Sequence, residues 1–404
     1  MLKDNDVVIV SAVRTPFDKF GGVLKEVPSI ELGAAVIKEV IERVNLNGSE
    51  VEEVFYGTCL PAETAMETNI PARLAMLKAG LPPETRSLTI DRACCSSLTA
   101  VSLCFEAIKS GRAKVCLAAG AENMSRASLL IPSSSRWGTR VGNLTVVDVL
   151  FQLGYRDYNP VSVDAGEVAV EMGVNREEQD NWAHQSQQRY ARAFEQGKFK
   201  VGGELMSLTL PSKKGSILFE TDSGFRPNTT IEQLSSLKPV YGSPTVTAGN
   251  APGLNAGAAA ILIMSRAKAK ELNLKPMATI LSGSGVAGPA REIAKIPATA
   301  IKKALEIANL KLEDLKLIEI NEAFAAMPLV ASKILADGNN RKLQDLRNKI
   351  NVNGGAIAIG HPVGASGARI LMTLMYELQR KGGGLGAATI CGGLCQGEAA
   401  TIQV

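Results

Sequence analysis

The sequence predicts an α/β protein made of two similar layered halves, with a loop-rich domain inserted between them. Three observations support this fold class. Strand-like and helix-like patterns alternate along the 404-residue chain, two distant segments match each other, and the region between them has no counterpart. A chain of this length is too long to fold around one small hydrophobic core, so we expect more than one domain.

The two matching segments are residues 36–58 and 300–322. Each has the pattern of an amphipathic helix, a polar turn and a buried strand, and Ile37 aligns with Ile301 in the same register as Asn45 with Asn309. After each segment a short helix, a strand, a long helix and a final strand are expected in the same order. This sustained register predicts an internal duplication.

The duplication sets the expected domain boundaries. The first half is residues 1–120 with 247–270, and the second half is residues 271–404. The inserted domain is residues 121–246, which are rich in polar stretches and loops. Because connecting segments often carry binding residues, we expect ligand contacts there.

Composition excludes several classes of protein. The formal net charge is only +4, and lysine and arginine form no run that would suit nucleic acid. No apolar segment reaches membrane-spanning length, and the first residues lack a secretion-signal pattern, so a cytoplasmic protein without membrane contact is expected. Seven cysteines argue against a disulfide framework, and their spacing does not match a zinc site, so no metal is expected.

Four cysteines are placed unusually, in turns rich in glycine and serine: Cys94, Cys95, Cys391 and Cys395. The other three, Cys59, Cys104 and Cys116, lie among apolar residues and are interpreted as core thiols.

The chain has only two histidines, of which His184 lies on a polar helical stretch that is expected to face solvent. His361 precedes the long helix of the second half, as Cys94 precedes that of the first. If the two helix starts face each other, a thiol and an imidazole meet there. A helix N-terminus is also expected to lower the pKa of the thiol.

Several motifs carry a resemblance to a known family. They are the stretches IVSAVRTPFDKFGG, DRACCSSLTA, VTAGNAPGLNAGAAA, EINEAF, NVNGGAIAIGHPVGASG and ICGGLCQG. In order and spacing they resemble the thiolases, a family of acyl-CoA acyltransferases, over essentially the full chain. The resemblance implies a duplicated fold with five layers, α-β-α-β-α.

The resemblance also implies the roles of individual residues. Cys94 is the nucleophile, activated by His361, and Cys95 occupies a position for a small bystander residue. Cys391 is the second catalytic cysteine, expected to move a proton at the α-carbon with a pKa tuned toward neutrality. Asn321 holds a water that forms an oxyanion hole with His361, and the backbone N–H groups of Cys94 and Gly393 form a second one.

The implied coenzyme A site departs from the family pattern. Arg226 matches a position that stacks on the adenine, and Ala251 and Pro252 lie where the pantetheine arm binds. Pro252 replaces a serine there, and proline offers neither an N–H nor a hydroxyl group. Ala256 replaces an aspartate, and residues 160–162 (Pro-Val-Ser) replace a His-Met-Gly motif.

The implied activity is the reversible condensation of two acetyl-CoA molecules to acetoacetyl-CoA and CoA, or the cleavage of longer 3-ketoacyl-CoAs. Coenzyme A is substrate and product, and no other cofactor is implied. A homodimer or homotetramer is expected. Two alternatives remain open: a decarboxylating ketoacyl synthase-type enzyme, and a non-catalytic thiolase-like scaffold subunit.

Overall fold

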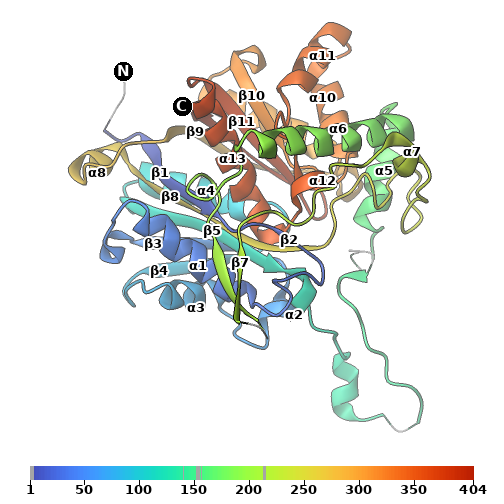
Figure 1. Cartoon of the computed structure of the whole chain (residues 1–404), viewed down its shortest axis with the longest axis horizontal. Coiled ribbons are helices and arrows are strands. Elements are labelled where there is room, and N and C mark those ends of the chain that lie inside the picture. The colour runs from blue at the N-terminus through green and yellow to red at the C-terminus, as the bar shows by residue number, and fades with distance from the viewer. Residues whose placement is uncertain (1–3, 140, 152–154, 156, 213–214) are drawn as a thin grey trace.

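The computed structural model describes residues 4–139, 141–151, 155, 157–212 and 215–404 (Figure 1). Its main sheet has the strand order β10-β11-β12-β9-β1-β8-β5-β3-β4, and the short β2 (Asp18–Lys19) pairs with β8. The strands of the first half are β1 (Val7–Arg14), β3 (Glu53–Gly57), β4 (Arg86–Ile90), β5 (Val115–Asn123) and β8 (Asn255–Ser265). Those of the second half are β9 (Ala278–Ala287), β10 (Leu315–Ile320), β11 (Leu385–Gly392) and β12 (Gln396–Gln403).

The sheet has the same pairing pattern in both halves. In the first half, β3 and β5 are parallel, and β8 runs antiparallel to both β5 and β1. In the second half, β10 and β11 are parallel, and β12 runs antiparallel to both β11 and β9. The two halves join where β1 and β9 pair antiparallel. Apart from β4 at the outer edge, the strand order is therefore symmetric about this junction, as expected from a duplicated fold.

Helices form layers on both sides of each half-sheet. Helices α4 (Ser96–Lys109) and α13 (Ser366–Arg380) contact each other and strands of both halves, so they form the central layer. Most of α13 is buried around its whole circumference, as a helix between two sheets must be. The outer layers contain α1 (Ser29–Glu42) and α3 (Pro71–Lys78) on the first half, and α9 (Ile296–Ala308) with α10 (Ala326–Ala336) on the second. This confirms the predicted layered α/β fold.

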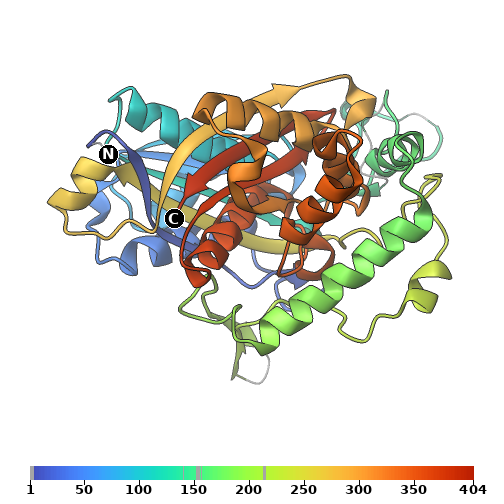
Figure 2. The ribbon, with the colours of Figure 1, turned by 90° about the horizontal axis from the view of Figure 1, so that it is seen from above.

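The insertion lies between β5 and β8. It contains α5 (Val161–Glu171), α6 (Arg176–Glu195), α7 (Ile231–Ser235) and a two-stranded hairpin of β6 (Leu208–Ser212) and β7 (Gly215–Phe219). The side chain of Asn175 caps α6 by accepting a hydrogen bond from the Glu178 N–H at 2.8 Å. Figure 2 shows α6 along one side of the molecule, where it packs on α12 (Ala356–Ile359).

A long arm extends from the body between β5 and α5 (Figure 1). Within it, Leu130 and Val147 pair in an antiparallel bridge. The remaining helices are α2 (Pro61–Thr64), α8 (Arg266–Glu271) and α11 (Asn340–Lys349). No helix in the described ranges is long and apolar enough to cross a bilayer.

Candidate active site

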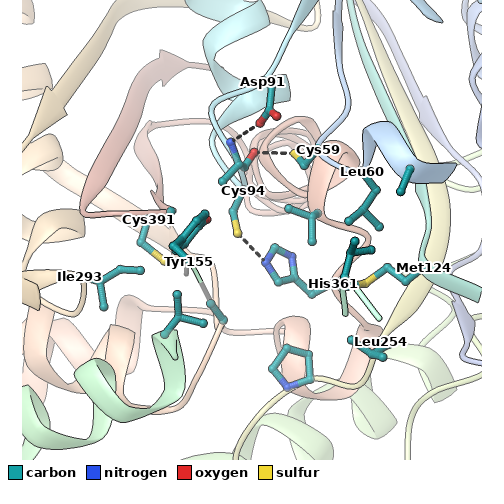
Figure 3. Close-up of a pocket in the computed structure, with 18 of the residues that line it drawn as sticks. Cys59, Leu60, Asp91, Cys94, Met124, Tyr155, Leu254, Ile293, His361 and Cys391 are labelled. Carbon is teal, nitrogen blue, oxygen red and sulfur yellow. Dashed lines mark hydrogen bonds between the residues drawn. The ribbon is translucent and has the colours of Figure 1, made fainter. Parts of the chain in front are cut away.

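A cavity of about 460 Å³ lies beside the N-terminal ends of the two central helices. Cys94, His361, Cys391 and Gly393, all predicted site residues, contribute to its lining (Figure 3). The rest of the lining is largely apolar and includes Leu60, Met124, Leu130, Val161, Ile293 and Phe324. Three groups able to move protons thus border one apolar cavity, which is the usual setting of a small-molecule site.

A strained turn presents Cys94 to this cavity. Ala93 has a φ of +49°, a left-handed conformation that non-glycine residues rarely adopt. The Ala93 N–H donates to the Asp91 carboxylate at 2.9 Å, and the Ala93 carbonyl accepts a hydrogen bond from the Cys59 thiol at 2.9 Å. Helix α4 begins at Ser96, so Cys94 lies just ahead of its first turn.

The neighbouring Cys95 points elsewhere. It is fully buried, and its thiol donates to the Ile390 carbonyl at 3.5 Å. Cys94 is partly exposed and borders the cavity, whereas Cys95 does not. Only Cys94 of this pair can therefore meet a substrate in the cavity.

His361 lies against the Cys94 thiol. Its Nε2 is 3.2 Å from the Cys94 Sγ, and its Nδ1 is 2.6 Å from the Ser366 Oγ. The Ser366 hydroxyl donates its proton to the Pro362 carbonyl at 2.8 Å, so its oxygen accepts from Nδ1–H. This arrangement assigns the proton to Nδ1 and leaves Nε2 free to accept a proton from Cys94.

Burial favours the neutral forms of this pair. It raises the pKa of Cys94 to about 12 and lowers the pKa of His361 to about 3, with the charge of Arg369 adding to the second shift. The expectation of a lowered Cys94 pKa was wrong, because desolvation outweighs the backbone hydrogen bond that acts to lower it. The resting pair is thus a thiol and an imidazole, and a thiolate forms only as the proton moves to Nε2.

Asn321 lies at the end of β10, beside the same imidazole. Its Nδ2 is 3.4 Å from the His361 Nε2, and its backbone N–H donates to the Thr389 carbonyl at 3.0 Å. The next residue, Glu322, is fully buried and its carboxylate accepts four hydrogen bonds from other elements. The donors are the side chains of Trp182, Ser186 and Asn351 and the backbone N–H of Ile357. Glu322 therefore ties α6 and the start of α12 to the strand that positions Asn321.

Cys391 and Gly393 come from the end of β11 and the turn after it. Burial raises the pKa of the Cys391 thiol well above its ordinary value, so the expectation of a pKa near neutrality was wrong. At Gly393, an added Cβ would lie 1.8 Å from the Tyr155 hydroxyl oxygen. A side chain there would force Tyr155 to move, which favours the second glycine of the ICGG stretch.

The residues predicted to bind coenzyme A do not all border the cavity. Pro252 borders the cavity, Ala251 is half-buried outside its lining, and Arg226 is exposed at the surface. The Arg226 backbone N–H donates to the Gln187 side chain at 2.8 Å. Ala256 is buried on β8 opposite Asp18 of β2.

Sequence reasoning missed some cavity residues. Cys59 was interpreted as a core thiol, and this was wrong, since it borders the cavity; Cys104 and Cys116 are fully buried as expected. A signal was available, because Cys59 follows β3 and Cys94 follows β4, and the carboxyl ends of neighbouring parallel strands lie at one edge. Tyr155 in the insertion has no comparable signal. His184 is half-buried on α6, outside the cavity lining.

Comparison with known proteins gives the family. The profile of the thiolase N-terminal domain matches residues 7–267, and that of the thiolase C-terminal domain matches residues 274–404. The chain belongs to the thiolase family. The resemblance inferred from its motifs is thereby confirmed.

Individual relatives are similar along their whole length. The chain is 43% identical to an acetyl-CoA acetyltransferase of Chromobacterium violaceum, covering 98% of this chain and 99% of the relative, and 43% identical to one of Cupriavidus necator with the same coverage. The crystal structure of the Bacillus anthracis acetyl-CoA acetyltransferase superposes with a TM-score of 0.91 at 36% identity, covering 98% of each chain. Human mitochondrial 3-ketoacyl-CoA thiolase gives the same TM-score, identity and coverage.

Proposed function

We propose that this thiolase catalyses reversible carbon–carbon bond formation between two acyl-CoA molecules, through an acyl group carried on Cys94. The observation that supports this most strongly is the 3.2 Å contact between the Cys94 thiol and the His361 Nε2 in a cavity that Cys391 also borders. The names of the relatives, acetyl-CoA acetyltransferase and 3-ketoacyl-CoA thiolase, describe the same chemistry in two directions.

In the first half-reaction, the Cys94 sulfur attacks the carbonyl carbon of an acyl thioester. His361 accepts the thiol proton at Nε2 and later gives a proton to the departing CoA sulfur. The backbone N–H groups of Cys94 and Gly393 stabilise the carbonyl oxygen as it becomes negative. The neutral imidazole supports this role, because a protonated ring could not accept the thiol proton.

In the second half-reaction, the Cys391 thiol first passes its proton to the His361 Nε2, and the resulting thiolate removes a proton from the α-carbon of a second acyl-CoA. Asn321, through a water, and the Nε2–H of the protonated His361 stabilise the enolate oxygen. The enolate carbon attacks the carbonyl carbon of the acyl group on Cys94, and the Cys94 sulfur leaves as the new carbon–carbon bond forms and takes the proton back from His361. A thiol suits this step because it can accept the proton in one direction and return it in the other.

The residues at and near the cavity wall support a proposed path for coenzyme A. The pantetheine arm passes Pro252, and the adenine lies at the surface against Arg226, with Ala251 beside the path. Apolar contacts at Pro252 take the place of a hydrogen bond that the family's serine would make. Coenzyme A enters and leaves as substrate and product, and the residues described need no further cofactor for either proton transfer.

The two alternatives are less well supported. A decarboxylating ketoacyl synthase would not need Cys391 as a base at an α-carbon, and the chain belongs to the thiolases. A scaffold subunit would be free to lose the reactive groups, yet Cys94, His361 and Cys391 all border one cavity.

Self-association is part of the proposal, as a homodimer or homotetramer. The arm carries exposed apolar side chains, including Trp137 at 86% and Val141 at 96% exposure. The edge strand β4 likewise leaves Leu88 half exposed. Such surfaces favour contact with a second copy. We place the protein in the cytoplasm, where a reducing environment would keep its seven free cysteines as thiols.

Thiolysis tests the proposed function. Acetoacetyl-CoA and longer 3-ketoacyl-CoAs are each incubated with free CoA and the protein, and loss of the ketoacyl thioester is followed with formation of acetyl-CoA. We expect cleavage of at least one of these substrates, and none with Cys94→Ala. Turnover only with malonyl-CoA would instead identify a decarboxylating enzyme, and a folded protein inactive on every substrate would support a scaffold.

A further inference from the structure

A buried arginine stands behind the candidate active site. Arg369 on α13 is fully buried, and its Nη2 donates to the Asn321 Oδ1 at 3.2 Å. The Asn321 Nδ2 lies 3.4 Å from the His361 Nε2, which in turn lies 3.2 Å from the Cys94 Sγ. One unbroken line of contacts thus runs from a buried cation to the nucleophile.

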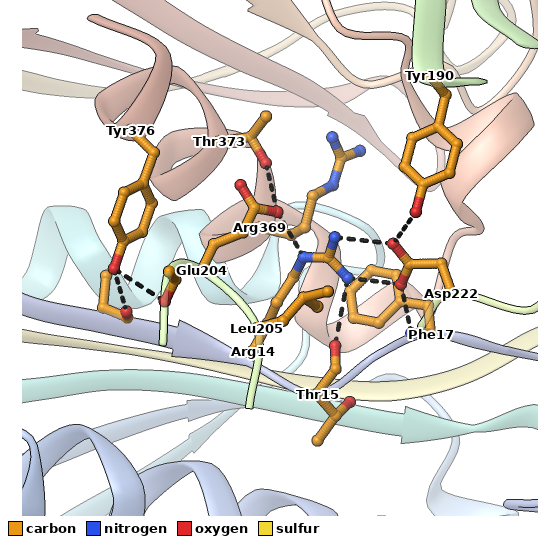
Figure 4. A network of polar contacts seen from close by, with 12 residues as sticks. Arg14, Thr15, Phe17, Tyr190, Glu204, Leu205, Asp222, Arg369, Thr373 and Tyr376 are labelled. Carbon is orange, nitrogen blue, oxygen red and sulfur yellow. Dashed lines mark hydrogen bonds and ion pairs between the residues drawn. The ribbon is translucent and has the colours of Figure 1, made fainter. Parts of the chain in front are cut away.

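Arg369 differs from the other buried arginine near it (Figure 4). Arg14 is matched by carboxylates: its Nε contacts Glu204 at 2.7 Å, and its two terminal nitrogens contact Asp222 at 2.6 and 2.9 Å. Among the described residues, the Arg369 Nε and Nη1 have no hydrogen-bond partner. Its nearest ion-pair partner is the Glu319 carboxylate, 3.8 Å from Nη1.

Glu319 does not cancel the charge of Arg369 at neutral pH. Burial raises the pKa of Glu319 to about 8, against the opposing effect of Arg369, so the carboxyl group is mostly protonated below that pH. A guanidinium remains charged even when buried. Among the described residues, no carboxylate forms a hydrogen bond with Arg369, and its positive charge acts on Asn321 and His361 in a medium that screens poorly.

The hydrogen bond also fixes the Asn321 amide. Because its oxygen accepts from Arg369, its NH₂ group must point the other way, toward His361. The reverse orientation would place a donor against a guanidinium, which has no acceptor. A donor aimed at a developing negative charge is most effective when it need not reorient during the reaction.

We propose that Arg369 is a positioning residue for the carbon–carbon bond-forming half-reaction: it holds the Asn321 amide donor toward the enolate oxygen and stabilises that oxygen with its buried charge. This proposal rests on the proposed function. It concerns the enolate step above all, because Asn321 and His361 serve that oxygen, whereas the first acyl transfer uses backbone N–H groups.

Two half-reactions separate this role from a general loss of structure. Acyl transfer to Cys94 is measured as a burst of CoA release, and enolate formation as exchange of the acetyl-CoA α-protons in deuterated water. In Arg369→Met, of similar length but uncharged, we expect exchange to fall by about 10²-fold, as for loss of one oxyanion donor. Acyl transfer should fall less than about 10-fold, and the KM for acetyl-CoA should stay within about 3-fold.

Arg369→Lys keeps the charge but loses the fixed planar fork, so it should recover part of the exchange. An exchange rate in Arg369→Met within about 3-fold of wild type, or an equal fall in both half-reactions, would overturn the proposal. If wild-type Cys94 takes up no acyl group at all, the proposed function fails instead, whatever the variants do.

A second variant keeps the test decisive if Arg369→Met does not fold. Glu319→Gln removes the group that neutralises Arg369 at high pH. The exchange rate of wild type, divided by that of Glu319→Gln, should fall as pH rises through about 8. Other charged groups facing this pair are Glu322, Glu204, Glu377 and Arg14, and all are common to both proteins. A ratio that stays constant from pH 7 to 9 would contradict the proposal.

Discussion

At the level of single residues, the chemistry depends on two groups that both rest in their neutral forms. Cys94 is a thiol and His361 a neutral imidazole, because burial disfavours charge on both. The sequence motifs predicted which thiol and which imidazole would matter. They could not predict these pKa directions, because burial arises from strands and helices that are far apart along the chain.

Because His361 is neutral in the folded protein, the free energy of unfolding should fall as the pH becomes acidic. The pKa of His361 is lowered from 6.5 to about 3 on folding, so its contribution is present above pH 6.5 and is lost as pH falls toward 3. Between pH 7 and pH 5, wild type should lose about 2 kcal/mol more unfolding free energy than His361→Asn, at 1.36 kcal/mol for each pH unit below 6.5. Urea unfolding at both pH values measures this, and parallel losses in the two proteins would refute it.

Replacement of Cys391 should impair the second half-reaction and spare the first. Cys391→Ala is expected to acylate Cys94 from acetyl-CoA, because the nucleophile and His361 remain. Condensation and α-proton exchange should fall by about 10²- to 10⁴-fold, as for loss of a general base. Cys395→Ala serves as the matched control and should retain both activities. Wild-type condensation in Cys391→Ala would make Cys391 structural and Cys395 the next candidate.

At the level of elements, the site is built from loops that follow strands, and two of these loops are held by a buried glutamate side chain. Glu122, at the end of β5, accepts hydrogen bonds from the backbone N–H groups of Cys59, Leu60 and Gly364. Glu322 acts in the same way at the end of β10. The sequence predicted the strands and the duplicated order, since these follow hydrophobic periodicity. It did not reveal the carboxylates as clamps, because their partners lie up to 242 positions away.

Glu322→Ala tests the clamp on α6 and α12. The change leaves the buried donors of Trp182, Ser186 and Asn351 without their acceptor, and each buried orphan costs about 1–3 kcal/mol. We expect a total loss of more than about 3 kcal/mol in unfolding free energy, measured by urea denaturation. Glu177→Ala, in the first turn of α6 at the surface, is the control. Similar stability of the two variants would show that the clamp contributes little.

At the level of the whole molecule, duplication brings two helix starts to one cavity and supplies a different reactive side chain from each half. The symmetric strand order could be anticipated from the match between residues 36–58 and 300–322. The extended arm could not be anticipated. Its apolar side chains face outward, so they do not follow the regular spacing of buried residues from which helices and strands are predicted.

The arm should control self-association. Replacing both Trp137 and Val141 by aspartate removes apolar surface that a second copy would cover. The molecular mass measured by sedimentation equilibrium should therefore decrease. Acyl transfer to Cys94 should continue, since neither residue borders the cavity. Leu218→Asp, at an exposed apolar position on β7, is the matched control and should keep the wild-type mass. An unchanged mass in the arm variant would place the interface elsewhere.

The central claim is that an acyl group passes through Cys94. Peptide mass mapping after brief incubation with acetyl-CoA tests it most directly, with Cys94→Ser and Cys95→Ser analysed beside the wild type. The account predicts one added acetyl group at Cys94 in wild type and in Cys95→Ser, and none in Cys94→Ser. An acetyl group on Cys95, or on Cys59 or Cys391 in place of Cys94, would contradict it.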